Sequence, residues 1–244
     1  MIHYPPLVEM LDIHKWFGGV HALKGVNFSV GKGEVVGLVG DNGAGKSTLI
    51  KILSGYYNPD RGKIIFEGKE VRFKSPADAR RLGIETVYQD QALCPNLNVP
   101  HNIFLGRERI KKLGFLNRKE MFAESAKLLT RLGLNLKSLD VPVEFLSGGE
   151  KQCVAIARSL YFNAKLVIMD EPTSALSLRE CQKVLEFIGK LKENNVSVVV
   201  ISHNLYHVFP VADRIVVLSK GRKIADIPKD QTSMDEVAQL IVSG

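Results

Sequence analysis

The sequence is poor in cysteine and contains no long apolar run. Its three cysteines, Cys94, Cys153 and Cys181, lie far apart, without a CxxC pair and without a histidine at ligand spacing. This favours reduced, mostly buried thiols over a disulfide framework or a thiolate metal site. The longest apolar stretches, such as VSVVVI at 196–201, are far too short to span a bilayer. The N-terminus has neither a basic flank nor an apolar core, so we expect no secretory signal and a cytoplasmic protein.

Internal repeats, low-complexity tracts and long linkers are also missing from the 244 residues, of which 45% are hydrophobic and 24% charged. Such a composition is that of an ordinary globular protein. The formal net charge is +7, and a basic surface suits nucleic acid, anionic lipid headgroups or a nucleotide. The lysines and arginines are scattered, however, and the densest run, RERIKK at 107–112, contains a glutamate. A solvated face is favoured there, and charge alone selects no partner.

The order of apolar and glycine-rich segments indicates an α/β core. The run EVVGLVG at 34–40 ends on glycine and is followed by KSTLIKILSG at helical spacing, which predicts a strand, a glycine loop and a helix. The runs at 165–172 and 196–204 are typical of strands buried on both faces of a parallel sheet, and an amphipathic helix at 177–195 separates them. We therefore expect a mostly parallel sheet whose phosphate-facing ends lie on one side.

Two further regions differ from this core. The segments LVEMLDIHKWF, VNFSV and GKIIFEGKEVRF are β-rich with glycines between them, which predicts a smaller N-terminal antiparallel β subdomain. From about residue 90 to 162 the strand signals disappear, and 118–134 and 150–162 are predicted to be helical. We expect 90–162 to form an inserted helical subdomain, and 1–89 with 163–244 to form the core and its β subdomain.

The clearest motif is a phosphate-binding loop, GDNGAGKST at 40–48, which fits G-x-x-x-x-G-K-[ST]. Its glycines allow backbone N–H groups to converge on a β-phosphate, and the helix N-terminus adds partial positive charge. Lys46 is expected to reach the β- and γ-phosphates, Ser47 to bind Mg²⁺, and Thr48 to donate to the α-phosphate. The alternative is a chance turn before a helix, which the flanking strand and helix disfavour. These features predict a P-loop NTPase core, and the N-K-x-D motif of GTPases is not found.

Polar residues follow the predicted strands where such a core would hold the phosphates. Asp170 and Glu171 end a buried run; Asp170 would serve the Mg²⁺ shell, and Glu171 would polarise an attacking water. The alternative is an acidic pair that merely ends a strand. His203 follows the next apolar run and is expected to meet the γ-phosphate if the two strands are neighbours, although a lone histidine is usually structural. Gln89 occupies a similar position and means little by itself.

The segment LSGGEKQ at 146–152 is the second glycine-rich candidate. Ser147 and Glu150 have the S-x-x-E spacing of a capping box at a helix start. Capping does not require two glycines, and glycine is most useful where the backbone must approach another group closely. In a head-to-tail pair, Ser147 and Gly149 of one copy would close over the γ-phosphate held by the other, so that each site is shared.

Taken together, these motifs resemble those of the ATP-binding-cassette (ABC) ATPases over nearly the whole chain, because LSGGxxQ is specific to that family among P-loop proteins. The resemblance implies that Glu171 is the catalytic base, that His203 supports the γ-phosphate, and that Gln89 senses Mg²⁺ and water. It also implies an aromatic ring stacked on adenine, for which spacing favours Phe17 over Trp16. The expected cofactors are ATP and Mg²⁺. The expected catalytic residues are Glu171, His203, Gln89 and Lys46; the metal ligands are Ser47, Gln89 and Asp170; the nucleotide-binding residues are Phe17, Gly40, Asn42, Gly43, Ala44, Gly45, Lys46, Ser47, Thr48, Ser147, Gly148 and Gly149.

The amino-acid sequences of several segments are similar to those of ATPase subunits of carbohydrate importers, particularly single-cassette relatives that handle fructose, ribose or xylose. These segments are GDNGAGKSTLIKILSG, GIETVYQDQAL, NIFLGRE and DEPTSALS. A single cassette makes a homodimer the expected ATP-binding form. Ser177 departs from the aspartate that most members carry in SALD, which puts the usual aspartate contact across the dimer in doubt.

The resemblance implies transmembrane permease subunits as partners, contacted by residues just after Gln89, and indirectly a periplasmic or lipid-anchored sugar-binding protein. The chain would then lie on the cytoplasmic face of the bacterial inner membrane. Two alternatives stay open: an ABC ATPase of another importer or of an exporter, and a non-transport ABC protein acting on nucleic acid or ribosomes. Members of the latter class usually carry tandem cassettes or a long coiled coil, which this sequence lacks, so no nucleic acid is expected as a partner.

Overall fold

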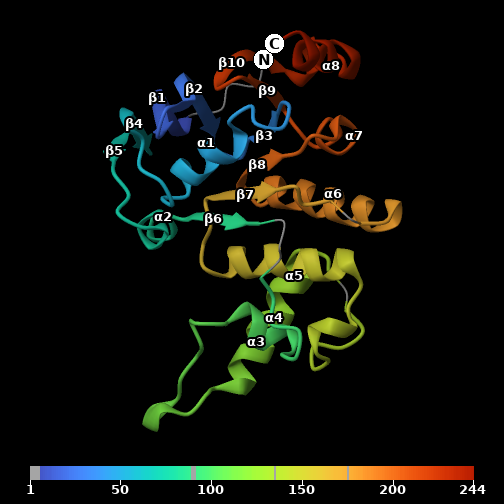
Figure 1. The fold of residues 1–244 in the computed structure, drawn as a ribbon. Coiled ribbons are helices and arrows are strands. Elements are labelled where there is room, and N and C mark those ends of the chain that lie inside the picture. Colours follow the sequence, from blue (N-terminus) through green and yellow to red (C-terminus); the bar gives the residue numbers. More distant parts are fainter. Residues whose placement is uncertain (1–5, 89–91, 135, 175) are drawn as a thin grey trace.

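A six-stranded sheet forms the centre of the computed structural model, which describes residues 6–88, 92–134, 136–174 and 176–244 (Figure 1). The strand order is β10-β9-β3-β8-β7-β6, parallel except for β10, which is antiparallel to β9. The expected mostly parallel sheet is therefore confirmed. Its strands are β3 (Val35–Val39), β6 (Ile84–Val87), β7 (Leu166–Asp170), β8 (Ser197–Ile201), β9 (Arg214–Ser219) and β10 (Arg222–Pro228).

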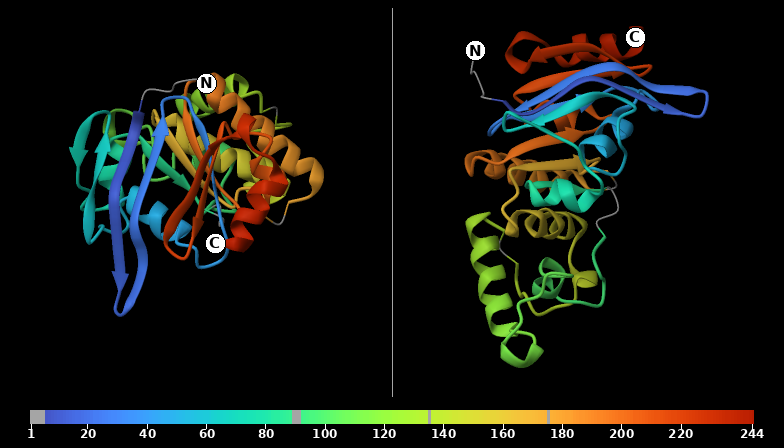
Figure 2. Two further views of the ribbon diagram at one scale, coloured as in Figure 1. Left: turned by 90° about the horizontal axis from the view of Figure 1, so that it is seen from above. Right: turned by 90° about the vertical axis from the view of Figure 1, so that its left-hand side faces the viewer.

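The N-terminal residues form a second, antiparallel sheet in the order β2-β1-β4-β5, as expected. In Figure 2 the long hairpin of β1 and β2 extends beyond the rest of this layer. Helix α1 (Lys46–Leu53) follows β3, and helix α2 (Pro76–Arg81) precedes β6. The four strands are β1 (Pro6–Phe17), β2 (Val20–Gly31), β4 (Arg61–Phe66) and β5 (Lys69–Val71).

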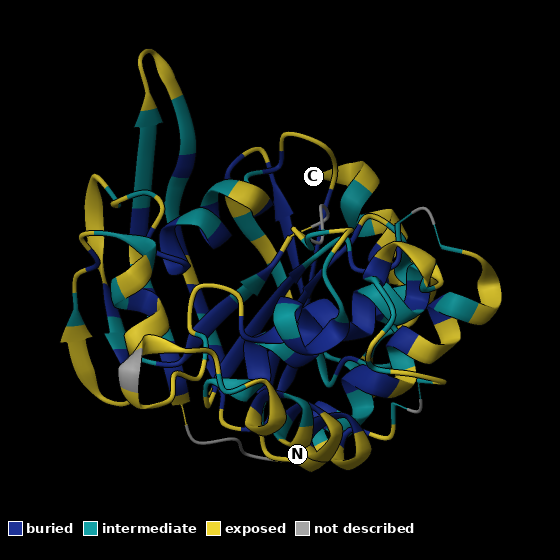
Figure 3. Cartoon of the chain, turned by 90° about the horizontal axis from the view of Figure 1, so that it is seen from below, coloured by how far each residue is buried: buried dark blue, intermediate teal, exposed yellow. Residues whose placement is uncertain are grey.

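Both faces of the central sheet are buried, which explains why its strands are apolar throughout. Val36 and Leu38 of β3 join a hydrophobic cluster shared with the antiparallel sheet and α1, whereas Val35 and Val39 join a second cluster on the other face. Alternate residues of a strand point to opposite faces, so one continuous apolar run serves two cores. Figure 3 shows these buried segments in the interior and exposed residues around the rim.

Helices cover the second face of the sheet. Helix α6 (Leu178–Glu193) lies between β7 and β8 in the chain, as predicted, and contributes Val184, Ile188 and Leu191 to the second cluster. The C-terminal part adds α7 (Leu205–Val208), the short helix η3 (Lys229–Gln231) and α8 (Met234–Ser243). None of the helices in the described ranges is long and apolar enough to cross a bilayer.

The segment between β6 and β7 forms the helical lobe at the far end of the molecule from the sheets (Figures 1 and 2). Its side chains belong to the same cluster as those of α6, so the lobe packs directly on the core. Buried Asn102 organises its first turn, because its amide donates to the carbonyls of Cys94, Leu97 and Asn98. The lobe comprises α3 (Val99–Ile103), η1 (Lys112–Gly114), α4 (Arg118–Arg131), η2 (Val143–Phe145) and α5 (Gly148–Tyr161).

Candidate functional site

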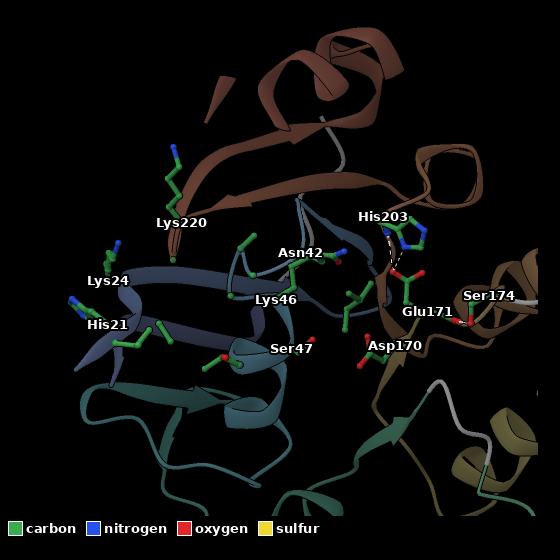
Figure 4. A pocket seen from close by; sticks show the side chains of 18 residues that line it. His21, Lys24, Asn42, Lys46, Ser47, Asp170, Glu171, Ser174, His203 and Lys220 are labelled. Carbon is green, nitrogen blue, oxygen red and sulfur yellow. Dashed lines mark hydrogen bonds and ion pairs between the residues drawn. The ribbon is translucent and has the colours of Figure 1, made fainter. Parts of the chain in front are cut away.

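A cavity of about 720 Å³ opens where the carboxyl ends of β3, β7 and β8 meet the start of α1 (Figure 4). Because β8 pairs with both β3 and β7, the residues after these three strands converge at one edge of the sheet. Many of the expected residues line the cavity: Asn42, Gly43, Ala44, Gly45, Lys46, Ser47, Thr48, Asp170, Glu171 and His203. The expectation that the strands before Asp170 and His203 are neighbours is confirmed, since Asp170 pairs with Ile201.

The loop between β3 and α1 requires glycine at two positions. Gly40 has φ +144, and a Cβ atom there would collide with the carbonyl oxygen of Leu218. Gly45 has φ +104, and its Cβ would lie 2.9 Å from a methyl carbon of Leu23. Both backbone conformations are strained for any residue with a side chain. The tight loop thus leaves the N-terminus of α1 open toward the cavity, which is the arrangement that binds phosphate groups.

Lys46 bends back over the loop that carries it. Its Nζ donates to the carbonyl oxygens of Gly40 at 2.6 Å and Asp41 at 2.8 Å. Burial lowers the pKa of the Lys46 ammonium, and the carboxylates of Glu171, Asp41 and Asp170 act in the opposite direction. The ammonium therefore lies among carbonyl and carboxylate oxygens. A phosphate oxygen bound there can replace the two carbonyl oxygens as the acceptor of its hydrogen bonds.

Glu171 is fixed by the segment that follows β8. The Ser202 hydroxyl donates to Glu171 Oε2 at 2.8 Å, and the backbone N–H of His203 donates to Oε1 at 3.0 Å. The Nδ1 atom of the His203 ring lies 2.7 Å from the same Oε1. Glu171 also has φ +49, an uncommon backbone conformation for a residue with a side chain. The carboxylate is thus held in one orientation at the cavity wall.

Asp170 stands next to Glu171 but has a different environment. Burial raises the pKa of the Asp170 carboxyl, the charge of Glu171 raises it further, and Lys46 and Lys51 oppose both effects. A cation bound between Asp170 and a phosphate group would relieve this repulsion. Ser47 contributes a hydroxyl to the same cavity.

This donor set fits Mg²⁺. Magnesium prefers oxygen ligands, keeps several waters, and typically takes one or two protein ligands together with substrate phosphates. In the described ranges, no group of three or more His, Cys, Asp or Glu side chains could hold a metal by themselves. Gln89, the third expected ligand, lies outside the residues that the structure describes.

The far end of the cavity contains residues that the sequence motifs did not indicate. Val20, His21, Ala22 and Lys24 of β2 line it, together with Lys220 and Gly221 of the β9–β10 turn. In Figure 4, His21, Lys24 and Lys220 lie at the opposite end from His203 and Glu171. In the sequence, these residues could have been identified only from their proximity to Phe17 and to a glycine turn.

The two aromatic candidates lie beside this end. Trp16 stacks on His21, with the ring centroids 4.0 Å apart and nearly parallel. The Phe17 ring is 41% exposed and meets Tyr57 edge-on at 5.2 Å, and Phe17 is not among the residues that line the cavity. Adenine stacking by Phe17 thus stays a prediction, and through His21 the Trp16 ring is connected to the cavity wall.

The segment 146–152 lies at the start of α5 in the helical lobe and does not line the cavity of its own chain. The expected capping box is confirmed: the Ser147 N–H donates to Glu150 Oε2 at 2.9 Å, and the Glu150 N–H donates to Ser147 Oγ at 3.3 Å. Ser147, Gly148 and Gly149 are therefore separated from the phosphate loop within one copy.

Glu180 gives the glycines of this segment a second, unexpected role. The Gly149 N–H donates to Glu180 Oε1 at 3.2 Å, and a Cβ on Gly149 would lie 2.9 Å from the Glu180 Cβ. Hydrogen bonds from the Ser177 hydroxyl and N–H, and then from Gly149, lower the pKa of Glu180 to about 2. Ser177, the departure from the SALD pattern, thus forms a capping box with Glu180 and shares that carboxylate with α5.

Known proteins resemble this chain in sequence. The family profile described as ABC transporter matches residues 23–174. A xylose/arabinose import ATP-binding protein of Sulfolobus acidocaldarius is 53% identical over 97% of this chain and 94% of its own length. A fructose import ATP-binding protein of Rhizobium meliloti is 46% identical over 96% of this chain and 93% of its own.

Solved structures agree with the sequence comparisons. An ATP-binding cassette of an ABC transporter in its ADP conformation matches with a TM-score of 0.82 and 28% identity, covering 98% of this chain and 99% of that one. A dimeric cassette in a post-hydrolysis state, bound to ADP and Pi, matches with a TM-score of 0.76 and 27% identity, covering 91% and 98%.

Proposed function

The chain belongs to the ABC transporter family of ATP-binding proteins, and on that premise we propose that it is the ATP-hydrolysing subunit of an importer for a monosaccharide. The observation that carries the proposal is the convergence of the phosphate loop, Asp170, Glu171 and His203 on one cavity. The 53% identity to a xylose/arabinose import ATP-binding protein, over nearly the full length of both chains, supports a sugar as the transported solute.

ATP would lie with its phosphates on the loop 40–48. Backbone N–H groups and the N-terminus of α1 would bind the β-phosphate, and Lys46 would exchange its two carbonyl partners for β- and γ-phosphate oxygens. Thr48 would donate to the α-phosphate. Ser47 and Asp170, with Gln89, would hold Mg²⁺, which supplies neutralisation of the phosphate charge.

Glu171 would act as the general base toward the attacking water. Its carboxylate needs a fixed orientation for that task, and Ser202 and the His203 N–H supply it. The His203 ring, which contacts the same carboxylate, would bind the γ-phosphate and couple its arrival to the position of the base. Phosphoryl transfer to water depends mainly on such positioning and on charge stabilisation, which is what these residues offer.

The site would be completed by a second copy of the chain. Ser147, Gly148 and Gly149 cannot serve the phosphates of their own copy, because α5 lies in the lobe away from that cavity. Two exposed apolar residues flank the same region: Phe145, 75% exposed, just before the segment, and Leu178, 85% exposed, just before Glu180. A head-to-tail dimer would bury both side chains and bring Ser147 and Gly149 to the partner's γ-phosphate. The solved dimeric cassette supports this arrangement.

Transmembrane permease subunits are the proposed partners, with a periplasmic or lipid-anchored sugar-binding protein as an indirect one. The chain would thus act at the cytoplasmic face of the membrane. Two cassette copies would close on ATP, move the permease, and separate after hydrolysis. No observation on this chain favours the other importer classes, an exporter, or action on nucleic acid over this proposal.

The test is the variant Glu171→Gln, assayed for ATP binding and for phosphate release. We expect ATP affinity to be retained, because the phosphate loop is untouched, and hydrolysis to be nearly abolished. Glu70→Gln, an exposed glutamate of β5, is the matched control and should hydrolyse ATP as the unaltered protein does. For the sugar, reconstitution with the permease should give ATP hydrolysis stimulated by the loaded sugar-binding protein. Rapid hydrolysis by Glu171→Gln would contradict the assignment of the base.

A further inference from the structure

A basic segment, residues 105–119, runs from the end of α3 into the first turn of α4 and lies outside the nucleotide site; we call it the basic hairpin. The Ile110–Leu116 bridge, the hydrogen bond from the Lys111 N–H to the Phe115 carbonyl at 2.7 Å, and the short helix η1 at its tip form its backbone. Figures 1 and 2 place it in the lobe, at the end of the molecule away from the two sheets. Backbone hydrogen bonds therefore define the conformation of its tip.

Four apolar side chains of the basic hairpin are exposed, and they lie on both of its faces. Ile110 is 65% exposed and Phe115 is 70% exposed, and Leu105 and Leu116 are exposed as well. Ile110 is paired with Leu116, so these two side chains share one face, whereas Phe115 is paired with Lys111 and points to the other. A strand that docks on a flat protein surface would carry apolar groups on one face only.

Cations surround these apolar groups. Six lysines and arginines and one glutamate, Glu108, give residues 105–119 a formal charge of +5. Arg107 donates to Glu85 of β6, and Arg109 donates to the Tyr161 hydroxyl of α5. In the described part of the chain, no carboxylate lies within ion-pair distance of the other four, which are all exposed: Lys111, Lys112, Arg118 and Lys119.

We propose that the basic hairpin binds the surface of an anionic lipid bilayer, with Ile110 and Phe115 inserted at the headgroup boundary and Lys111 and Lys112 on the lipid phosphates. Exposed apolar groups ringed by unpaired cations are the combination that binds such interfaces. A hairpin tip that inserts into a bilayer is surrounded by lipid on both of its faces, which matches the apolar groups on both faces. The proposal goes beyond ATP hydrolysis, because it gives the chain a membrane contact independent of any permease.

The experiment measures co-flotation of the full chain with vesicles of phosphatidylcholine alone or mixed with phosphatidylglycerol. We expect binding to the anionic vesicles, weakened by added salt because screening shortens the range of the attraction. The double variant Lys111→Gln/Lys112→Gln should lose at least about tenfold in binding, since each cation near an anionic surface contributes roughly fivefold. Ile110→Ser/Phe115→Ser should also lose binding, and here the charge is unchanged.

Matched controls make the same chemical changes elsewhere on the surface. Lys63→Gln/Lys69→Gln removes two exposed lysines from the hairpin of β4 and β5, and Val242→Ser removes an exposed apolar side chain from α8. Both controls should bind anionic vesicles within about twofold of the unaltered protein. Circular dichroism verifies that all variants are folded.

Three results would overturn the proposal. The unaltered chain could fail to bind anionic vesicles, or the hairpin variants could bind as well as the controls. Alternatively, the hairpin variants could lose binding only to membranes that contain the permease, which would make the partner a protein. Vesicle binding needs neither ATP nor a permease, whereas the Glu171→Gln test needs no lipid, so the proposed function and the lipid contact can fail separately.

Discussion

Ser202→Ala removes the hydroxyl that donates to Glu171 Oε2 at 2.8 Å, without touching the phosphate loop. Ser202 is buried, and its oxygen also accepts the Asn204 N–H at 3.1 Å. A hydrogen bond to a charged group contributes about 1.5–3 kcal/mol. If only about half of the lower free energy serves to hold the carboxylate in its reactive orientation, its loss lowers kcat by roughly threefold. If the whole of the higher free energy does, its loss lowers kcat by more than about a hundredfold.

We therefore expect kcat to fall by about tenfold, between these limits, and KM for ATP to change by less than about twofold. The assay is steady-state phosphate release over a range of ATP concentrations. Ser159→Ala is the control: Ser159 is also buried and donates to a carbonyl, that of Ile156 at 2.6 Å, but it belongs to α5 of the helical lobe and does not line the cavity. It should lower the melting temperature without lowering kcat.

An unchanged kcat in Ser202→Ala would rule out this role of Ser202, because it would mean that Glu171 is oriented without the Ser202 hydroxyl. A rise in KM with an unchanged kcat would refute it as well, since that pattern reports lost ground-state binding and not a misplaced base.

Two further predictions concern the segment 146–152 and its contact with α6. Ser147→Arg should nearly abolish hydrolysis, because the bulky cation would block the approach of this segment to the partner's γ-phosphate. The ATP affinity of the monomer, measured with a fluorescent nucleotide, should change by less than about twofold, because the monomer's own phosphate loop is untouched. The depressed pKa of Glu180, about 2 against 4.5 in the unfolded chain, means that its contribution to stability is complete above pH 4.5 and is lost as the pH falls toward 2. Urea melts of Glu180→Gln should accordingly differ from the unaltered protein at pH 7 and converge with it near pH 2; a constant difference would contradict this.

The sequence allowed the central sheet and the phosphate site to be predicted because both depend on local patterns. Apolar runs identified β3, β7 and β8, and the polar residues that follow them converge wherever such strands are parallel neighbours. The antiparallel sheet and the capping box at Ser147 were predictable for the same reason.

Contacts that depend on the packing of distant elements could not be predicted. The reach of Glu180 to the Gly149 N–H depends on how α6 lies against α5, and S-x-x-E spacing at Ser177 alone does not indicate it. His21 and Lys220 reach the cavity only because the β1–β2 hairpin and the β9–β10 turn meet beside it. The exposure of Ile110 and Phe115 likewise changes the interpretation of a basic run that charge alone left as a solvated face.

We propose that each ATP site is shared by two copies of the chain, and size-exclusion chromatography of Glu171→Gln detects this sharing. We expect a dimer with ATP and Mg²⁺, a monomer without nucleotide, and a monomer with ATP when Ser147→Arg is added. A Glu171→Gln variant that binds ATP but elutes only as a monomer would contradict the shared site, and so would a dimer that persists with Ser147→Arg.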